Sequence, residues 1–213
     1  MVSTQPGPDG LDRCSWCLST PEYIAYHDKE WGFPVSDDRR LFEKLTLESF
    51  QSGLSWRTIL AKRENFRAAF DGFDVRRMAA YTQADVERLL QDAGIVRHRG
   101  KIEAAINNAA RALELIADEG SLAAYVWRFL PTDQTSSSQP VSTAPVSTSA
   151  ASVAMSKDLR KRGWAFVGPT TVYAFMQAMG LVNDHAHDCA IRERVAQARA
   201  AFLSGPMQTV NSP

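Results

Sequence analysis

The chain has 213 residues, of which 45% are hydrophobic and 23% charged, and its formal net charge is zero. These values are typical of a globular protein with one large domain or two small ones. No apolar run approaches the roughly 18 residues of a membrane-spanning helix, and residues 1–11 are too polar for a signal peptide. We therefore expect a cytoplasmic protein with no membrane partner, whose cysteines are thiols or metal ligands.

Signals for helices follow one another along the chain. Thr20 before Pro21 predicts a helix start, Asp74 predicts another, and Thr82 with Asp85 forms the pattern of a capping box. Apolar spacing or composition predicts further helices from 41, across 59–70, over 101–118 and 122–129, from 153, and over 169–179 and 186–203. Since no convincing alternating strand and no repeat interrupts them, the predicted fold class is all-α.

The segment 132–152 breaks this pattern. It is dominated by Ser, Thr, Pro and Gln and has no helical period, so we expect an irregular segment there. The predicted organisation is a single domain over 12–203, made of two helical subdomains, with disordered tails at 1–11 and 204–213.

Residues 163–171 combine glycines, a proline and two threonines at the start of an amphipathic helix. Such a turn leaves backbone N–H groups exposed at a helix N-terminus, where the helix dipole also favours a phosphate. Basic clusters at 97–101 and 157–162 support contact with nucleic acid, although the neutral total charge argues mildly against it. The alternative is an ordinary corner between helices whose basic faces are solvated.

The cysteines and histidines concentrate near the two ends of the chain. A thiolate and an imidazole from each end would complete a tetrahedral zinc site, which is structural because no coordination position stays open. Spacing of four would place His185 and Cys189 on one helical face. Spacing alone does not decide which residues of each group are the ligands. The candidates are Cys14, Cys17 and His27 near one end of the chain and His185, His187 and Cys189 near the other.

An acidic residue and several aromatic residues mark the first quarter of the chain. Glu48 falls on the apolar stripe of its helix, where a carboxylate is costly unless a partner is supplied. Aromatic rings are more often core residues, but electron-rich rings around a buried carboxylate suit a flat, cationic ligand that donates hydrogen bonds. The rings are those of Trp16, Tyr23, Tyr26, Trp31 and Trp56.

Several stretches are highly specific when taken together: 23–28, 30–32, 47–48, 53–56, 62–65, 92–95, 97–102 and 180–185. In these the sequence resembles the bacterial 3-methyladenine DNA glycosylase I family, over nearly all of residues 13–189. The resemblance implies a helix-hairpin-helix DNA glycosylase fold, with the hairpin at 166–171. It implies a monofunctional enzyme that flips N3-methyladenine out of alkylated double-stranded DNA and hydrolyses its N-glycosidic bond. A monomer in the bacterial cytoplasm, at the nucleoid when bound to DNA, is expected.

The resemblance also implies roles for single residues. A structural Zn²⁺ would be held by Cys14, His27, His185 and Cys189, which leaves Cys17 and His187 outside the site. Glu48 would recognise the adenine edge, and the five rings named above would stack on the base. Gly53 and Leu54 would fill the gap left in the DNA, and Gly168, Thr170 and Thr171 would bind phosphates.

One position departs from the wider superfamily, whose members place an aspartate shortly after the hairpin. Here the run is 182–185 and Asn183 stands at the aspartate's place. No lysine beside the hairpin has the position of a Schiff-base nucleophile, so we expect no lyase activity. Two alternatives remain: a lesion-binding protein without catalysis, and an unrelated zinc hydrolase with an open site at Asp184, His185 and His187.

Overall fold

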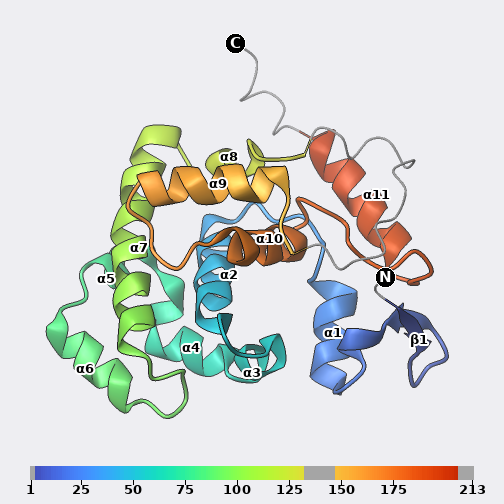
Figure 1. Cartoon of the computed structure of the whole chain (residues 1–213), viewed down its shortest axis with the longest axis horizontal. Helices are drawn as coiled ribbons and strands as arrows, with labels where there is room; N and C mark the ends of the chain where they lie inside the picture. The colour runs from blue at the N-terminus through green and yellow to red at the C-terminus, as the bar shows by residue number, and fades with distance from the viewer. Residues whose placement is uncertain (1–2, 132–146, 206–213) are drawn as a thin grey trace. The chain divides into compact units, whose positions relative to one another are not determined.

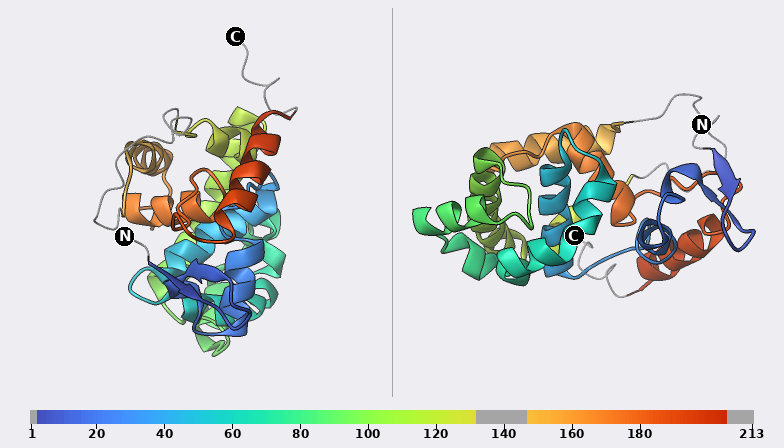
Figure 2. Two further views of the ribbon diagram at one scale, coloured as in Figure 1. Left: turned by 90° about the vertical axis from the view of Figure 1, so that its right-hand side faces the viewer. Right: turned by 90° about the horizontal axis from the view of Figure 1, so that it is seen from below.

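The structure, a computed structural model, describes residues 3–131 and 147–205, which form two compact units (Figures 1 and 2). Among these residues, unit 1 comprises 3–35, 130–131, 147 and 176–205, and unit 2 comprises 36–129 and 148–175. None of the helices described is long and apolar enough to span a bilayer.

Unit 1 is built from both ends of the described chain. It contains strands β1 (Thr4–Pro6) and β2 (Asp12–Cys14), the 3-10 turn η1 (Ser15–Cys17), and helices α1 (Pro21–Lys29) and α11 (Arg192–Leu203). The Thr20 hydroxyl accepts a hydrogen bond from the Tyr23 N–H at 3.2 Å, which confirms the predicted start of α1. Arg13, which is buried, forms ion pairs with Asp9 and Asp28 and so joins the hairpin to α1.

The amino-terminal segment differs from the prediction. Residues 1–11 were expected to be a disordered tail, but β1 pairs antiparallel with β2, with Thr4 opposite Cys14. The fold is therefore mostly helical rather than purely helical. Strands of three residues are too short for an alternation of apolar and polar residues to be visible in a sequence. The register of β1 against β2 depends on their pairing, which the local sequence does not predict.

Unit 2 is helical throughout its described residues. In chain order its helices are α2 (Asp38–Gln51), α3 (Trp56–Ala61), α4 (Arg63–Ala69), η2 (Asp71–Phe73), α5 (Val75–Ala79), α6 (Gln83–Gln91), α7 (Arg99–Glu119), α8 (Leu122–Trp127), α9 (Ala150–Lys161) and α10 (Pro169–Ala178), whose last turn belongs to unit 1. Residues Leu41 to Phe50 of α2 are all buried, and α2 packs against α3, α7 and α8. Phe50, Phe66, Phe70 and Phe73 form a ring cluster beside it.

Three helix boundaries correct the sequence prediction. The segment 59–70 is two helices divided at Lys62. Helix α9 begins at Ala150, because Ser149 and Ser152 form a capping box, so the last residues of the expected irregular segment 132–152 are helical. Residues 132–146 lie outside the described part. The helix expected over 186–203 begins only at Arg192.

Gly180 occupies a backbone position that few other residues would tolerate. Its φ is +82°, and a Cβ would lie 2.6 Å from the backbone nitrogen of Pro34. We expect Gly180→Ala to lower the free energy of unfolding by about 2–4 kcal/mol, through left-handed strain and the backbone clash. Gly120→Ala is the matched control, since its φ is +83° but nothing lies within 4 Å. Gly120→Ala should lower the free energy of unfolding, measured with urea, by only about 1–2 kcal/mol. Equal losses of stability in the two variants would contradict a backbone clash at Gly180.

Candidate functional site

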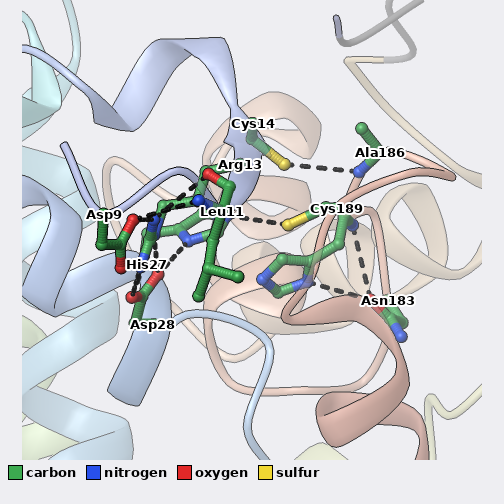
Figure 3. Close-up of polar contacts among 10 residues, drawn as sticks. Asp9, Leu11, Arg13, Cys14, His27, Asp28, Asn183, Ala186 and Cys189 are labelled. Carbon is green, nitrogen blue, oxygen red and sulfur yellow. Dashed lines mark hydrogen bonds and ion pairs between the residues drawn. The ribbon is translucent and has the colours of Figure 1, made fainter. Parts of the chain in front are cut away.

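Three metal-ligating side chains meet inside unit 1 (Figure 3). The ligand atoms of Cys14, His27 and Cys189 all lie within 4.8 Å of one another, and the three side chains are buried. Cys14 ends β2, His27 lies in the last turn of α1, and Cys189 lies in the turns before α11. His27 Nε2 is 3.5 Å from Cys189 Sγ, and the Ala186 N–H donates to Cys14 Sγ at 3.3 Å. The fold thus brings the two ends of the chain to one cluster.

Two histidine rings are held by their Nδ1 atoms. His27 Nδ1 lies 2.8 Å from Asp28 Oδ1, and His185 Nδ1 lies 3.0 Å from Asn183 Oδ1. An acceptor at Nδ1 fixes the proton there and leaves Nε2 as the ligand atom, as in most metal-binding histidines. His185 is 1% exposed, and its Nε2 has no hydrogen-bond partner within the described residues. A buried nitrogen of this kind fits a fourth metal ligand.

In the absence of a metal, protons link the side chains of the cluster. A hydrogen bond from Cys14 lowers the pKa of Cys189 to about 3, and the pKa of Cys14 is raised far above its usual range, so the two sulfurs share one proton. Burial opposes protonation of His27, but hydrogen bonds with Cys17 and Cys189 outweigh it and raise its pKa to about 10. Burial lowers the pKa of His185 to about 4. Two sulfurs and two imidazoles are the donor set of a structural zinc.

Four of the predicted aromatic residues form one cluster against these histidines. The ring centroids of Trp16 lie 5.0 Å from those of Tyr23 and Trp31, and Tyr23 and Tyr26 are stacked at 6.4 Å. The Trp31 ring lies 4.6 Å from the His185 ring. These rings therefore pack directly against the two histidines in unit 1.

Glu48 in unit 2 has the partner that its burial demands. Glu48 is 5% exposed, and its Oε1 lies 2.7 Å from the Lys44 Nζ, one helical turn earlier on α2. The same Nζ lies 3.1 Å from the centroid of the Trp56 ring, at the first position of α3. The buried carboxylate, the buried cation and the partly buried aromatic ring thus form one group.

The turn between α2 and α3 presents an apolar tip. Gly53 has a φ of +79°, and Leu54 is 40% exposed, one of the few exposed large apolar side chains among the described residues. The Lys101 Nζ donates to the carbonyl oxygens of Phe50 and Ser52 at 2.9 and 2.6 Å. These bonds satisfy carbonyl groups at the end of α2 and hold the base of the turn in place.

The connection between α9 and α10 is a tightly held hairpin. Asn108 makes two hydrogen bonds of 2.9 Å with the backbone of Ala165, and the Ser49 hydroxyl donates to the Phe166 carbonyl at 3.1 Å. Phe166 has a φ of +56° and is 41% exposed. Since Pro169 begins α10, the first N–H groups of that helix have no partner within it.

Residues 16–193 match the model of a protein family described as methyladenine glycosylase. The chain belongs to the methyladenine glycosylase family. It is 51% identical over 180 residues to DNA-3-methyladenine glycosylase 1 of Escherichia coli, covering 84% of this chain and 96% of the relative. It is 44% identical to DNA-3-methyladenine glycosylase of Haemophilus influenzae, covering 83% and 96%.

Solved structures of methyladenine glycosylases share this fold. A crystal structure of 3-methyladenine DNA glycosylase I covers 84% of this chain and 98% of its own, with a TM-score of 0.76 and 50% identity. The Staphylococcus aureus enzyme, described for its recognition of 3-methyladenine, covers 84% and 96%, with a TM-score of 0.76 and 34% identity. Both similarities extend over almost the whole of the relatives.

Some features of this methyladenine glycosylase could not be taken from spacing. His185 and Cys189 do not share a helical face, because residues 183–191 are not helical. His187 points to solvent, with 87% of its side chain exposed, whereas Cys17 is buried but lies outside the three-residue group. Lys44 was missed, although its position four residues before Glu48 was a signal for a charge pair.

The Lys101 contacts lead to a prediction for the turn that carries Leu54. Lys101→Met removes two charge-assisted hydrogen bonds from a side chain that is 7% exposed. We expect the free energy of unfolding to fall by about 2–4 kcal/mol and amide exchange to rise at residues 50–54. Lys157→Met, at an exposed position of α9, is the control in both measurements. Unchanged exchange at 50–54 would show that Lys101 does not hold this turn.

Proposed function

We propose that this protein hydrolyses the N-glycosidic bond of N3-methyladenine in double-stranded DNA and leaves an abasic site. The observation that carries the proposal is the buried carboxylate of Glu48 beside the Trp56 ring, in a chain 51% identical to the Escherichia coli enzyme. N3-methyladenine is cationic, so its glycosidic bond is already weak. An aromatic face attracts such a cation, and a carboxylate accepts the N–H donors of its edge.

The chemistry requires little acid catalysis. Glu48 positions the base, and electrostatic stabilisation of the oxocarbenium-like sugar with a bound water supplies the remaining rate enhancement. The reaction is simple hydrolysis without strand cleavage. Stacking on aromatic rings contributes about 1–3 kcal/mol per base. Trp16, Tyr23, Tyr26 and Trp31 remain predicted stacking residues in addition to Trp56.

In this proposal the protein binds DNA phosphates through backbone N–H groups. The hairpin region at 166–171, which includes the start of α10, serves as a helix-hairpin-helix element, in which Gly168, Thr170 and Thr171 bind phosphate oxygens. The rigid support of the hairpin by Asn108 and Ser49 favours this role. The exposed Leu54, presented by Gly53, fills the space of the flipped nucleotide.

The zinc has a structural role. Cys14, His27, His185 and Cys189 would hold it, and their burial and shared proton support this set. When bound, zinc would supply no chemistry to the substrate, since four protein ligands close its coordination shell. It would fasten β2 and α1 to the segment before α11.

The direct test is release of 3-methyladenine from methylated DNA by the purified protein, as a monomer, with no metal added. We expect release without strand cleavage, and persistence of the activity after brief treatment with a chelator. Tight binding to alkylated DNA without release would indicate a silent lesion-binding protein. Rapid loss with the chelator would indicate the zinc hydrolase. In the cell we propose that the enzyme acts in the cytoplasm at the nucleoid.

A further inference from the structure

A lysine occupies the proposed recognition group of unit 2. The Lys44 Nζ lies 2.7 Å from Glu48 Oε1 and 3.1 Å from the Trp56 ring centroid, and the side chains of Lys44 and Glu48 are 7% and 5% exposed. One ammonium thus meets the carboxylate and the ring face together. Both contacts are internal to unit 2, since α2 and α3 belong to it.

The ammonium offers this group the same chemistry as a methylated adenine that is still bonded to its sugar. It carries a positive charge for the ring and N–H donors for the carboxylate. A planar base stacked on the same ring face would need its atoms at about 3.5 Å from the ring plane. With Nζ at 3.1 Å from the centroid, that volume is filled. The ammonium and a base on this face therefore exclude one another.

We propose that Lys44 is an internal competitor of the base, which holds Glu48 and covers Trp56 in the free enzyme and withdraws when a base binds. The inference rests on the proposed function of Glu48 and Trp56. Every base that enters must displace the same ammonium, so the cost is independent of the base. Lys44 consequently weakens the hold on the released base and favours departure of the product.

The test is calorimetric binding of two free bases, 3-methyladenine and adenine, to the full chain. Lys44→Met, which preserves side-chain length without charge, should tighten binding of both bases by about tenfold or more. The factor should be the same for both, because the displaced group is the same. A residue that touched the base directly would instead change the ratio of the two affinities. Lys44→Arg, whose planar cation stacks well on tryptophan, should give no gain, and Lys157→Met should leave both affinities unchanged.

A second measurement uses the unaltered protein and does not depend on the folding of a variant. In the free enzyme the Lys44 Cε protons should be shifted upfield by the Trp56 ring current. Saturating 3-methyladenine should abolish that shift. A Lys44→Met protein with unchanged or weaker affinity, a different factor for the two bases, or a Lys44 signal that stays upfield would overturn the inference. If Glu48→Gln still weakens binding, the proposed function survives that failure; a wild-type protein that releases no 3-methyladenine overturns both.

Discussion

Glu48→Gln should lower the rate of 3-methyladenine release by about 10- to 100-fold. A hydrogen bond to a charged group contributes about 1.5–3 kcal/mol, and each 1.4 kcal/mol is a factor of ten in rate. The substitution keeps the size of the side chain and removes the charge that pairs with Lys44 and that we propose for recognition of the base edge. Release from methylated DNA measures the effect, and binding to undamaged DNA should remain nearly intact because phosphate contacts supply it.

The matched control for this prediction is Glu43→Gln. Glu43 lies on the same helix, is also buried, and pairs with Arg67 at 2.7 Å instead of Lys44. Each substitution removes one buried carboxylate from an ion pair, Lys44 with Glu48 or Arg67 with Glu43, and should destabilise the fold, although Arg67 keeps its pair with Glu64. Only Glu48→Gln should reduce release. Equal losses of release in both variants, in proportion to their unfolding, would remove Glu48 from the recognition of the base.

Cys14→Ser should abolish zinc binding and lower the melting temperature by about 8–16 °C. The loss of a structural metal ranks among the few changes that cost more than about 4 kcal/mol, and 1 kcal/mol corresponds to about 2–4 °C in a chain of this size. Metal analysis and thermal unfolding measure the two effects. Acidification should also release the metal, because protons compete for the thiolates and imidazoles.

Two controls separate the metal ligands from their neighbours. His187→Gln changes an exposed histidine two residues from His185 and should keep full zinc content and stability. Cys17→Ser changes a buried thiol and should lower stability while zinc is retained. Full zinc in Cys14→Ser, or its loss in His187→Gln, would place the site elsewhere.

Helix starts were predictable because their signals are local. Thr20, Asp74 and Thr82 each cap a helix in the structure as predicted. The short strands were not predictable, since β1 depends on pairing with β2. Likewise, the non-helical segment 183–191 brings Cys189 to the cluster by tertiary contacts. The spacing of four residues that predicted a shared helical face with His185 was therefore misleading.

In the candidate site, too, local features were predictable from the sequence and tertiary contacts were not. Burial of Glu48 followed from the apolar stripe of α2, and its need for a partner followed from its charge. The partner could have been found from the spacing of Lys44 and Glu48. Its position over Trp56 could not, because it depends on the angle at which α3 leaves the turn after Gly53, whose φ is +79°.

Unit 1 combines the first and last parts of the described chain, and this has a consequence for synthesis on the ribosome. The longer segment of unit 2, residues 36–129, emerges well before Cys189, so much of that unit's core can form during translation. Cys14 and His27 can meet Cys189 only after that residue has been synthesised, and their contact closes a loop that spans most of the sequence. A chain that is interrupted early therefore exposes unpaired thiols and an incomplete unit 1. Such a product should be open to proteases, and only a chain that extends beyond Cys189 can bring Cys14, His27 and Cys189 together.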